Sequence, residues 1–276
     1  MSAAHDPLVF AHGNSFPGGT YTQLLKSLRQ RGFAPRAVDK FGHDSKYPVT
    51  NNWPHLVRQL HDFAQREADR SGMRPWLVGH SLGGFLSVMC AARHPELVRG
   101  VVLIDSPVLG GWRASAVSVL KQTQLVGALS PGAISRNRRH RWPDAAAALE
   151  HFRHKRAFAH WDPQCLADYI AHGTHDDEDG QRVLSFDRDI ETAIYNTLPD
   201  NLERLLKRHP LRCPAAFVGG TRSAEMRQVG MAMTERLTHG RIMLLEGTHL
   251  LPMERPVAVA AAVEASIRGM QEHAPA

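Results

Sequence analysis

Cysteine and long apolar runs are both scarce in this sequence. Its 276 residues include only three cysteines, Cys90, Cys165 and Cys213, which are scattered and form no CxxC or Cys/His spacing. That pattern argues against a disulfide scaffold or a structural zinc site, so we expect reduced thiols, no metal and no cofactor. No apolar span reaches membrane length, and residues 1–7 form neither a basic leader nor an apolar signal segment. The sequence therefore predicts a soluble, cytoplasmic protein that does not bind a membrane.

Acidic residues are fewer than basic ones, which raises the question of a polyanionic partner. The net charge is +6, and one run is strongly basic: Arg136, Arg138, Arg139, His140 and Arg141. No recognisable nucleic-acid module surrounds this run, and an acidic run lies in the same middle region of the chain. We therefore interpret the basic run as a solvated surface. A small-molecule substrate is expected in place of a nucleic-acid partner, and the oligomeric state is left open.

Hydrophobic patterning predicts one α/β domain with an insertion. With 43% hydrophobic residues, the chain is long enough to bury a large core. Short apolar runs of the kind found in buried strands alternate with helical patterns, and these runs lie at residues 8–11, 34–38, 76–80, 101–104, 215–218 and 242–245. The alternation predicts a mostly parallel sheet of about six strands, covered by helices on both faces.

The alternation stops between residues 108 and 212, where helical patterns follow one another. Asp162 followed by Pro163 has the form of an N-cap and a proline at the first helical position. We interpret 108–212 as an inserted helical cap over the carboxyl edge of the sheet, and 1–107 with 213–276 as the core. Its aromatic residues form either a pocket wall or the cap's own core, and they are Trp112, Trp142, Phe158 and Trp161.

Residues 76–90 read as a strand, a sharp turn and a helix, with a serine at the turn. A strand that enters a helix with almost no loop strains the central residue, so small residues are needed two positions before and after it. Gly79 and Gly83 flank Ser81 in this way. The turn places the Ser81 hydroxyl at the positive end of the helix, and the Leu82 N–H faces the group that Ser81 attacks. The pattern predicts a nucleophile.

A serine nucleophile needs a base, and His249 is the candidate. It follows a predicted strand in the segment 247–256, which reads Gly-Thr-His-Leu-Leu-Pro-Met-Glu-Arg-Pro. The carboxyl ends of parallel strands share one edge of the sheet, so His249 and Ser81 are expected to meet there despite their separation in sequence.

These motifs together resemble the α/β-hydrolase fold family. The resemblance rests on Gly-His-Ser-Leu-Gly at 79–83, the His-Gly loop at 12–13, and the Gly-x-His-x-x-x-x-Glu-x-Pro segment at 247–256. It covers residues 7–108 and 213–268 and leaves the helical middle as the variable cap. The family usually begins with a two-strand hairpin, which this sequence does not show, so about six strands are expected.

The resemblance implies a role for each matched position. Ser81 is the implied nucleophile and His249 the general base and acid. The backbone N–H groups of Asn14 and Leu82 are the implied oxyanion hole, with Ser15 as the other possible donor.

The third member of such a triad is less clear, because Ser223 stands where the family usually has its acid. A serine cannot stabilise an imidazolium by charge. Two carboxylates are candidates: Glu225, two residues further on, and Asp105, which follows the strand at 101–104. Some family members carry the acid after that earlier strand. We favour Asp105, because Glu225 is expected in the first turn of the next helix.

The predicted function is that of a serine hydrolase that cleaves an ester-type acyl bond of a small, largely apolar substrate through an acyl-enzyme. A serine at the elbow disfavours dehalogenase and epoxide-hydrolase chemistry, which need a carboxylate there. Thioester, lactone or carbon–carbon bond hydrolysis uses the same triad and stays an alternative. A non-catalytic ligand binder of the same fold is the alternative outside the enzyme class.

Overall fold

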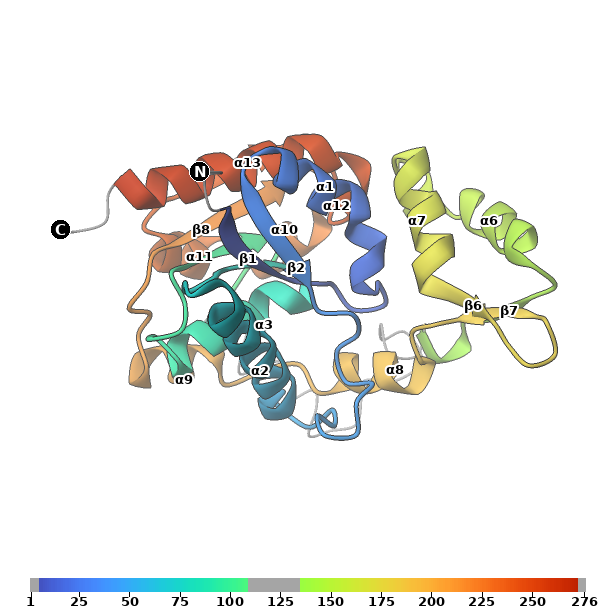
Figure 1. Ribbon diagram of the computed structural model, residues 1–276, viewed down its shortest axis with the longest axis horizontal. Helices are drawn as coiled ribbons and strands as arrows, with labels where there is room; N and C mark the ends of the chain where they lie inside the picture. Colours follow the sequence, from blue (N-terminus) through green and yellow to red (C-terminus); the bar gives the residue numbers. More distant parts are fainter. Residues whose placement is uncertain (1–4, 109–134, 273–276) are drawn as a thin grey trace.

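The core of the protein is a six-stranded parallel sheet (Figure 1). The computed structural model describes residues 5–108 and 135–272. Neighbouring strands pair in the order β2-β1-β3-β4-β8-β9, and every one of these pairs is parallel. Their bounds are β1 Asp6–Ala11, β2 Phe33–Ala37, β3 Trp76–His80, β4 Gly100–Ile104, β8 Ala215–Gly220 and β9 Ile242–Leu245. The sheet predicted from the sequence is confirmed.

Helices bury both faces of this sheet. On one side lie α1 (Thr22–Gln30) and α13 (Pro256–Glu272), and on the other lie α2 (Pro54–Ser71) and α3 (Leu82–Arg93). Successive side chains of a strand point to opposite faces, so Leu8 and Phe10 of β1 join the first cluster while Val9 and Ala11 join the second. Burial on both faces explains why the central strands read as unbroken apolar runs.

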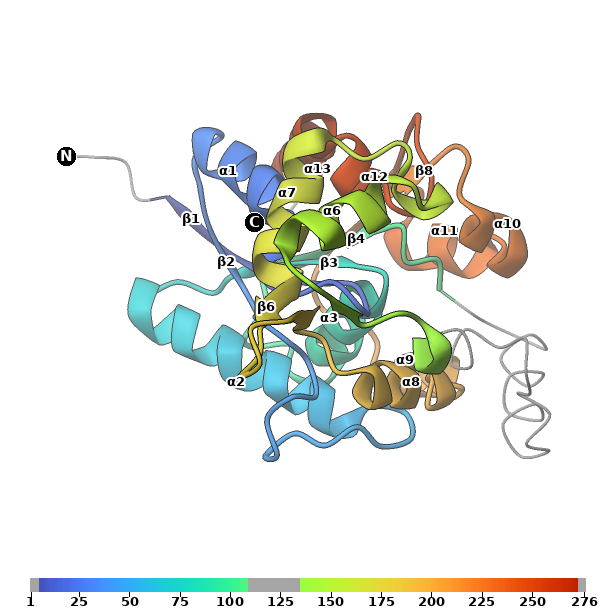
Figure 2. The ribbon, with the colours of Figure 1, turned by 90° about the vertical axis from the view of Figure 1, so that its right-hand side faces the viewer.

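The segment between β4 and β8 lies over the carboxyl ends of the strands (Figure 2). Its helices are α6 (Ala145–Arg153), α7 (Pro163–Gly173), α8 (Arg188–Asn196) and α9 (Leu202–Arg208), with a 3-10 turn, η2, at Arg156–Phe158. Asp162 accepts the N–H of Gln164 at 2.8 Å, as expected of the cap of α7. Residues 109–134 of the predicted cap, including Trp112, lie outside the described residues.

The prediction that this segment is helical throughout was wrong. It contains a small antiparallel sheet of order β5-β7-β6, made of Arg141–Trp142, Arg182–Leu184 and Thr174–Asp176. Strands of two or three residues show no run of alternating polarity, so the periodicity of the sequence does not reveal them.

Aromatic side chains form the core of the inserted segment. Trp142 packs on Phe152, while Phe158 packs on Trp161 and Tyr169. Trp142 and Trp161 are 1% and 7% exposed and so belong to this core. The basic run is partly neutralised nearby, because Arg141 pairs with Asp177 at 3.0 Å and Arg138 pairs with Glu191 at 2.8 Å.

Shorter elements complete the core around the strand ends. A 3-10 turn, η1 (Gly18–Tyr21), precedes α1, and α12 (Leu251–Glu254) precedes α13. Two short helices, α10 (Ala224–Val229) and α11 (Ala232–Thr238), lie between β8 and β9. They separate at Gly230, whose φ of 78° is left-handed and ends the first helix.

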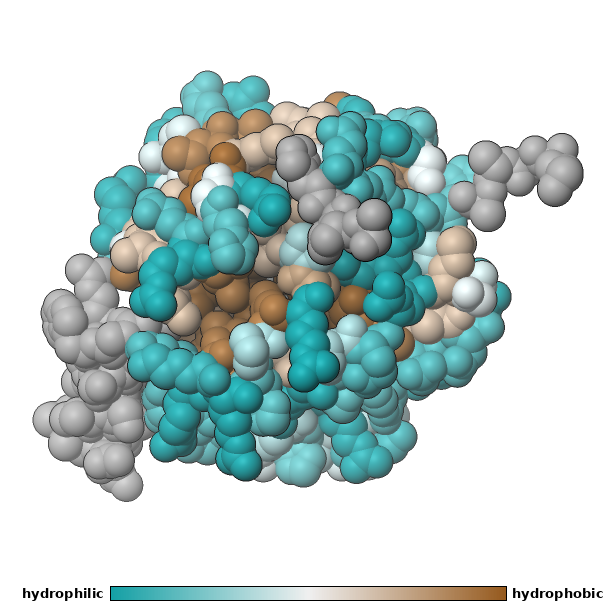
Figure 3. Space-filling view, turned by 90° about the vertical axis from the view of Figure 1, so that its left-hand side faces the viewer, coloured by the Kyte–Doolittle hydropathy of each residue, from teal (hydrophilic) through white to brown (hydrophobic). Residues whose placement is uncertain are grey.

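The strands run from left to right in Figure 1, and Figure 3 shows the face at which they begin. There, apolar side chains gather around a central hollow, and hydrophilic side chains surround them. Among the described helices, none combines the length and the apolar character that crossing a bilayer requires.

Candidate active site

The backbone at Ser81 has the sharp turn that the sequence predicts. β3 ends at His80, α3 begins at Leu82, and Ser81 between them has a φ of 52°. A Cβ atom on Gly79 would lie 2.2 Å from the Gly83 carbonyl oxygen, and one on Gly83 would lie 2.0 Å from the Ala11 carbonyl oxygen. Both positions therefore require glycine, and the strained turn presents the Ser81 side chain at the carboxyl edge of the sheet.

A hydrogen-bonded chain joins Ser81, His249 and Asp105. Ser81 Oγ lies 3.0 Å from His249 Nε2, and His249 Nδ1 lies 2.9 Å from Asp105 Oδ1. An ionised carboxylate only accepts, so Nδ1 donates to Asp105, and Nε2 is left to accept the Ser81 hydroxyl proton. This is the arrangement in which an imidazole can remove a proton from a serine.

Asp105 is held by more than His249. Its side chain is fully buried, its Oδ2 accepts the Gly220 N–H at 2.8 Å, and its Oδ1 accepts the Ser223 hydroxyl at 2.6 Å. Ser223, the residue at the family's usual acid position, thus acts as a donor to the carboxylate on the neighbouring strand. The same hydroxyl caps α10 by accepting the Met226 N–H at 3.2 Å.

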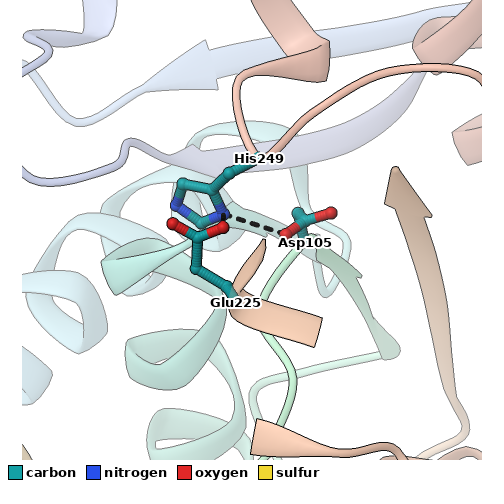
Figure 4. Close-up of side chains that lie close together, drawn as sticks. All are labelled: Asp105, Glu225 and His249. Atoms are coloured by element: carbon teal, nitrogen blue, oxygen red, sulfur yellow. Dashed lines mark hydrogen bonds and ion pairs between the residues drawn. The ribbon is translucent and has the colours of Figure 1, made fainter. Parts of the chain in front are cut away.

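The Glu225 carboxylate also lies beside this imidazole (Figure 4). Its Oε2 is 3.7 Å from His249 Nδ1, and its side chain is 44% exposed, whereas that of Asp105 is fully buried. The structure therefore brings both candidate carboxylates to His249, with the hydrogen bond going to Asp105. Among the described residues, this trio is the group with metal-ligand spacing, its donor atoms all lying within 4.8 Å of one another.

The charges in this group favour an ionised acid beside a basic imidazole. Burial by itself raises the pKa of Asp105, but hydrogen bonds from His249, Ser223 and Gly220 outweigh burial and bring that pKa below its ordinary value. For His249, burial lowers the pKa, while the bond to Asp105 and the charges of Glu225 and Asp105 overcome this and raise it.

The loop after β1 brings Asn14 to the cavity that Ser81 also lines. Hydrogen bonds fix Gly13 on both sides: its N–H donates to the Tyr21 hydroxyl at 2.9 Å, and its carbonyl accepts from His12 Nδ1 at 2.8 Å. The N–H groups of Asn14 and Leu82 have no hydrogen-bond acceptor within residues 5–108 and 135–272. Leu82 begins α3, where an N–H group has no partner within the helix.

His80 links this loop to the His249 backbone. Its Nε2 donates to the His249 carbonyl at 2.8 Å, and its Nδ1 accepts from the Tyr21 hydroxyl at 2.8 Å. Burial lowers the pKa of His80 to about 3, so the ring is uncharged and makes both bonds as a neutral imidazole. Sequence reasoning gave no role to Tyr21, whose hydroxyl joins Gly13 to His80.

Glu254 holds the loop that carries His249. Its two carboxylate oxygens accept the N–H and the hydroxyl of Thr248, at 2.8 and 2.5 Å. The Gly-x-His-x-x-x-x-Glu pattern therefore places a carboxylate that fixes the residue next to His249, which gives this spacing a physical reason.

A cavity of about 800 Å³ opens onto Ser81 and His249 between the core and the inserted segment. Its apolar wall includes Phe16, Phe158 and Leu250, and Tyr195 also lines it. Charged side chains share the lining, namely Arg138, Arg156, Arg222, Glu225 and Glu254. The cavity therefore combines an apolar wall with charged groups.

A comparison with known proteins assigns the family. Residues 8–262 match the model of the alpha/beta hydrolase family, so this chain belongs to that family. It is 34% identical to 2-(acetamidomethylene)succinate hydrolase of Mesorhizobium japonicum over 105 residues, which are 36% of this chain and 34% of that protein. It is 31% identical to human (Homo sapiens) monoglyceride lipase over 107 residues, which are 37% of this chain and 35% of that protein.

The match with a solved structure is more extensive. The crystal structure of E-2-(acetamidomethylene)succinate hydrolase superposes with a TM-score of 0.70 at 22% identity, covering 96% of this chain and 92% of that one. At this identity the likeness concerns the fold. The two curated relatives, by contrast, are matched over about a third of their length.

Proposed function

We propose that this protein is a serine hydrolase that cleaves ester-type acyl bonds, with Ser81, His249 and Asp105 as its catalytic triad. The observation that carries the proposal is the hydrogen-bonded chain from Ser81 Oγ through the two nitrogens of His249 to a buried carboxylate. The backbone N–H groups of Asn14 and Leu82, which have no acceptor among the described residues, are the proposed oxyanion donors. The lipase and the hydrolase among its relatives agree with bond hydrolysis.

In the proposed mechanism, Ser81 Oγ attacks the substrate carbonyl while His249 Nε2 takes its proton. The Asn14 and Leu82 N–H groups bind the oxyanion of the tetrahedral intermediate, and each such donor is typically worth about 3 kcal/mol. His249 then gives its proton to the leaving alcohol, and the acyl group stays on Ser81. Water, activated by His249, repeats the attack and releases the acid.

The cavity suggests how a substrate is placed. We propose that 108–212 act as a cap on the core formed by 1–107 and 213–276, because residues of both parts line the cavity. The apolar part of the ester would lie against Phe16, Phe158 and Leu250, and a polar group would face the arginines. Thioesters, lactones or carbon–carbon bonds would reach Ser81 in the same way.

Replacement of the nucleophile tests the proposal. Wild-type protein should hydrolyse short p-nitrophenyl esters and be labelled by a fluorophosphonate probe, whereas Ser81→Ala should do neither with its fold intact by circular dichroism. Ser45→Ala, at an exposed serine, is the matched control and should behave as wild type. Absence of labelling in folded wild-type protein would favour the ligand binder, and turnover by Ser81→Ala would overturn the mechanism.

A further inference from the structure

A buried carboxylate of the inserted segment contacts the loop that carries the Asn14 N–H. Glu191 lies on α8 and is 3% exposed. One of its carboxylate oxygens accepts a short hydrogen bond from Ser15 Oγ, and the other pairs with Arg138 Nη2 at 2.8 Å. Its backbone carbonyl accepts from Asn14 Nδ2 at 3.1 Å. Asn14 and Ser15 are thus both attached to one residue, 176 positions after Ser15 in the chain.

These contacts fix the loop from the side opposite the core. Ser15 has a left-handed φ of 77°, and its N–H donates to Asn14 Oδ1 at 3.1 Å. Without support, a serine leaves such a conformation readily, because only glycine adopts it at little cost. Gly13, on the other side of Asn14, is held by Tyr21 and His12 of the core. The Asn14 N–H therefore lies between one anchor in the core and one in the insert.

We propose that Glu191 is a positioning residue that aims the Asn14 N–H at the oxyanion, so that the inserted segment completes the oxyanion hole. The inference rests on the proposed function, since it assigns a role within that same site. Arg138 allows the arrangement, because a buried carboxylate is costly to keep charged without a paired cation. Its guanidinium also forms part of the cavity wall, next to the loop that it stabilises through Glu191.

The size of the effect follows from the oxyanion-hole geometry. Deleting one donor outright costs about 10²- to 10³-fold in kcat. Removing the bond between Ser15 and the Glu191 carboxylate loosens the loop next to Asn14, while Asn14 Nδ2 keeps its bond to the Glu191 backbone carbonyl. The donor is then misdirected but not removed, so we expect a loss of about ten- to a hundredfold in kcat. The loss should fall on kcat and leave KM nearly unchanged, because the oxyanion forms after the substrate has bound.

Two variants disturb the contact from its two ends. Glu191→Gln keeps the shape of the side chain but removes its charge and leaves one acceptor oxygen for two donors, the Ser15 hydroxyl and the Arg138 guanidinium. Ser15→Ala removes the donor hydroxyl at little further backbone cost, since alanine and serine both carry a Cβ atom at this φ. If both act through the same bond, the double variant should lose little more activity than the more damaged single variant. Asp189→Asn, an exposed acid on the same helix, is the matched control and should keep wild-type kcat.

The decisive measurement compares two inhibitors in each variant. A trifluoromethyl ketone that adds to Ser81 places an oxyanion in the hole, so its inhibition constant should rise by the same factor by which kcat falls. The product alcohol makes no oxyanion, and its inhibition constant should stay within twofold. A purely structural role for Glu191 would weaken both inhibitors alike.

Several results would overturn the proposal. Active variants with kcat within twofold of wild type would show that the contact does not position the donor, as would a higher KM at constant kcat. If Glu191→Gln fails to fold, Ser15→Ala alone must show the matched loss of kcat and of ketone affinity. Failure of the proposed function is distinguishable, because wild-type protein itself would then neither turn over esters nor take the fluorophosphonate label.

Discussion

Replacing Asp105 by asparagine should move the ring proton of His249 from Nδ1 to Nε2. In the native site, Asp105 Oδ2 accepts the fixed N–H of Gly220 while Oδ1 accepts from His249 Nδ1. An asparagine has one carbonyl oxygen, which must face Gly220 because that backbone donor cannot turn. Its NH₂ group then faces His249, where it donates to Nδ1 and leaves the proton on Nε2. In that tautomer, Nε2 has no lone pair with which to accept the Ser81 proton.

The expected loss of kcat is therefore far larger than the loss of the Asp105 charge alone would cause. Where an asparagine replaces the acid of a serine-protease triad and traps the wrong tautomer, kcat falls about 10⁴-fold, and we expect a fall of that order for Asp105→Asn. Glu225 lies 3.7 Å from Nδ1 with a side chain that is 44% exposed. A charge at such a distance in a water-like dielectric contributes ~1 kcal/mol, so Glu225→Gln should cost about fivefold or less.

Steady-state hydrolysis of p-nitrophenyl butyrate and the rate of fluorophosphonate labelling measure both losses. Glu246→Gln, at a side chain that is 70% exposed, is the control for loss of a surface carboxylate. The double variant Asp105→Asn with Glu225→Gln shows whether Glu225 supports the residual activity. The reasoning is refuted if Asp105→Asn retains kcat within tenfold of wild type, or if Glu225→Gln is the more damaging change.

Three further predictions concern pH and packing. Since burial lowers the pKa of His249 while Asp105 and Glu225 raise it to a net higher value, Glu225→Gln should move the acid limb of the kcat/KM profile to lower pH; a limb that stays in place or moves up contradicts this. Burial lowers the pKa of His80 to about 3 and that of His12 to about 4, so below about pH 6.5 the unfolded chain takes up protons that the folded protein does not. The free energy of unfolding, from urea titrations, should then fall by up to ~1.4 kcal/mol per unit decrease in pH for each histidine, and His80→Gln should reduce this slope. An unchanged slope in His80→Gln would contradict the assignment. Gly83→Ala should lower the free energy of unfolding by about 1–3 kcal/mol or more, because its Cβ would lie 2.0 Å from the Ala11 carbonyl oxygen. Gly269→Ala has open space around it in α13 and should raise the melting temperature. Equal melting curves for the two variants would contradict the packing argument.

The core of this protein could be predicted from its sequence because local pattern and global fold agree there. Buried parallel strands are short apolar runs, and the glycines around Ser81 are required by contacts of 2.0 to 2.2 Å that tolerate no Cβ. The motif order then places Ser81 and His249 on one sheet edge. The placement of Asp105 also follows, since β4 ends beside β3 and delivers the next residue to that edge.

The remaining features depend on contacts that leave no local pattern. Glu191 reads in the sequence as one more polar residue of a helix, and its contact with Ser15 spans 176 positions. Tyr21 resembles an ordinary core aromatic until its hydroxyl is seen between Gly13 and His80. The break between α10 and α11 does have a local signal in the sequence, because Gly230 is a residue type that commonly ends a helix.

The attachment of the Asn14–Ser15 loop to α8 has a consequence for engineering. Inserted segments are natural targets for exchange between relatives, and in this protein residues of the insert and of the core both line the cavity. In this protein, a foreign segment lacking an acidic residue opposite Ser15 would deprive Ser15 Oγ of its acceptor, and one whose backbone ran elsewhere would also deprive Asn14 Nδ2 of its carbonyl partner. A chimera would therefore need to transfer the loop and the cap helix together, as one exchangeable unit drawn from two distant parts of the chain.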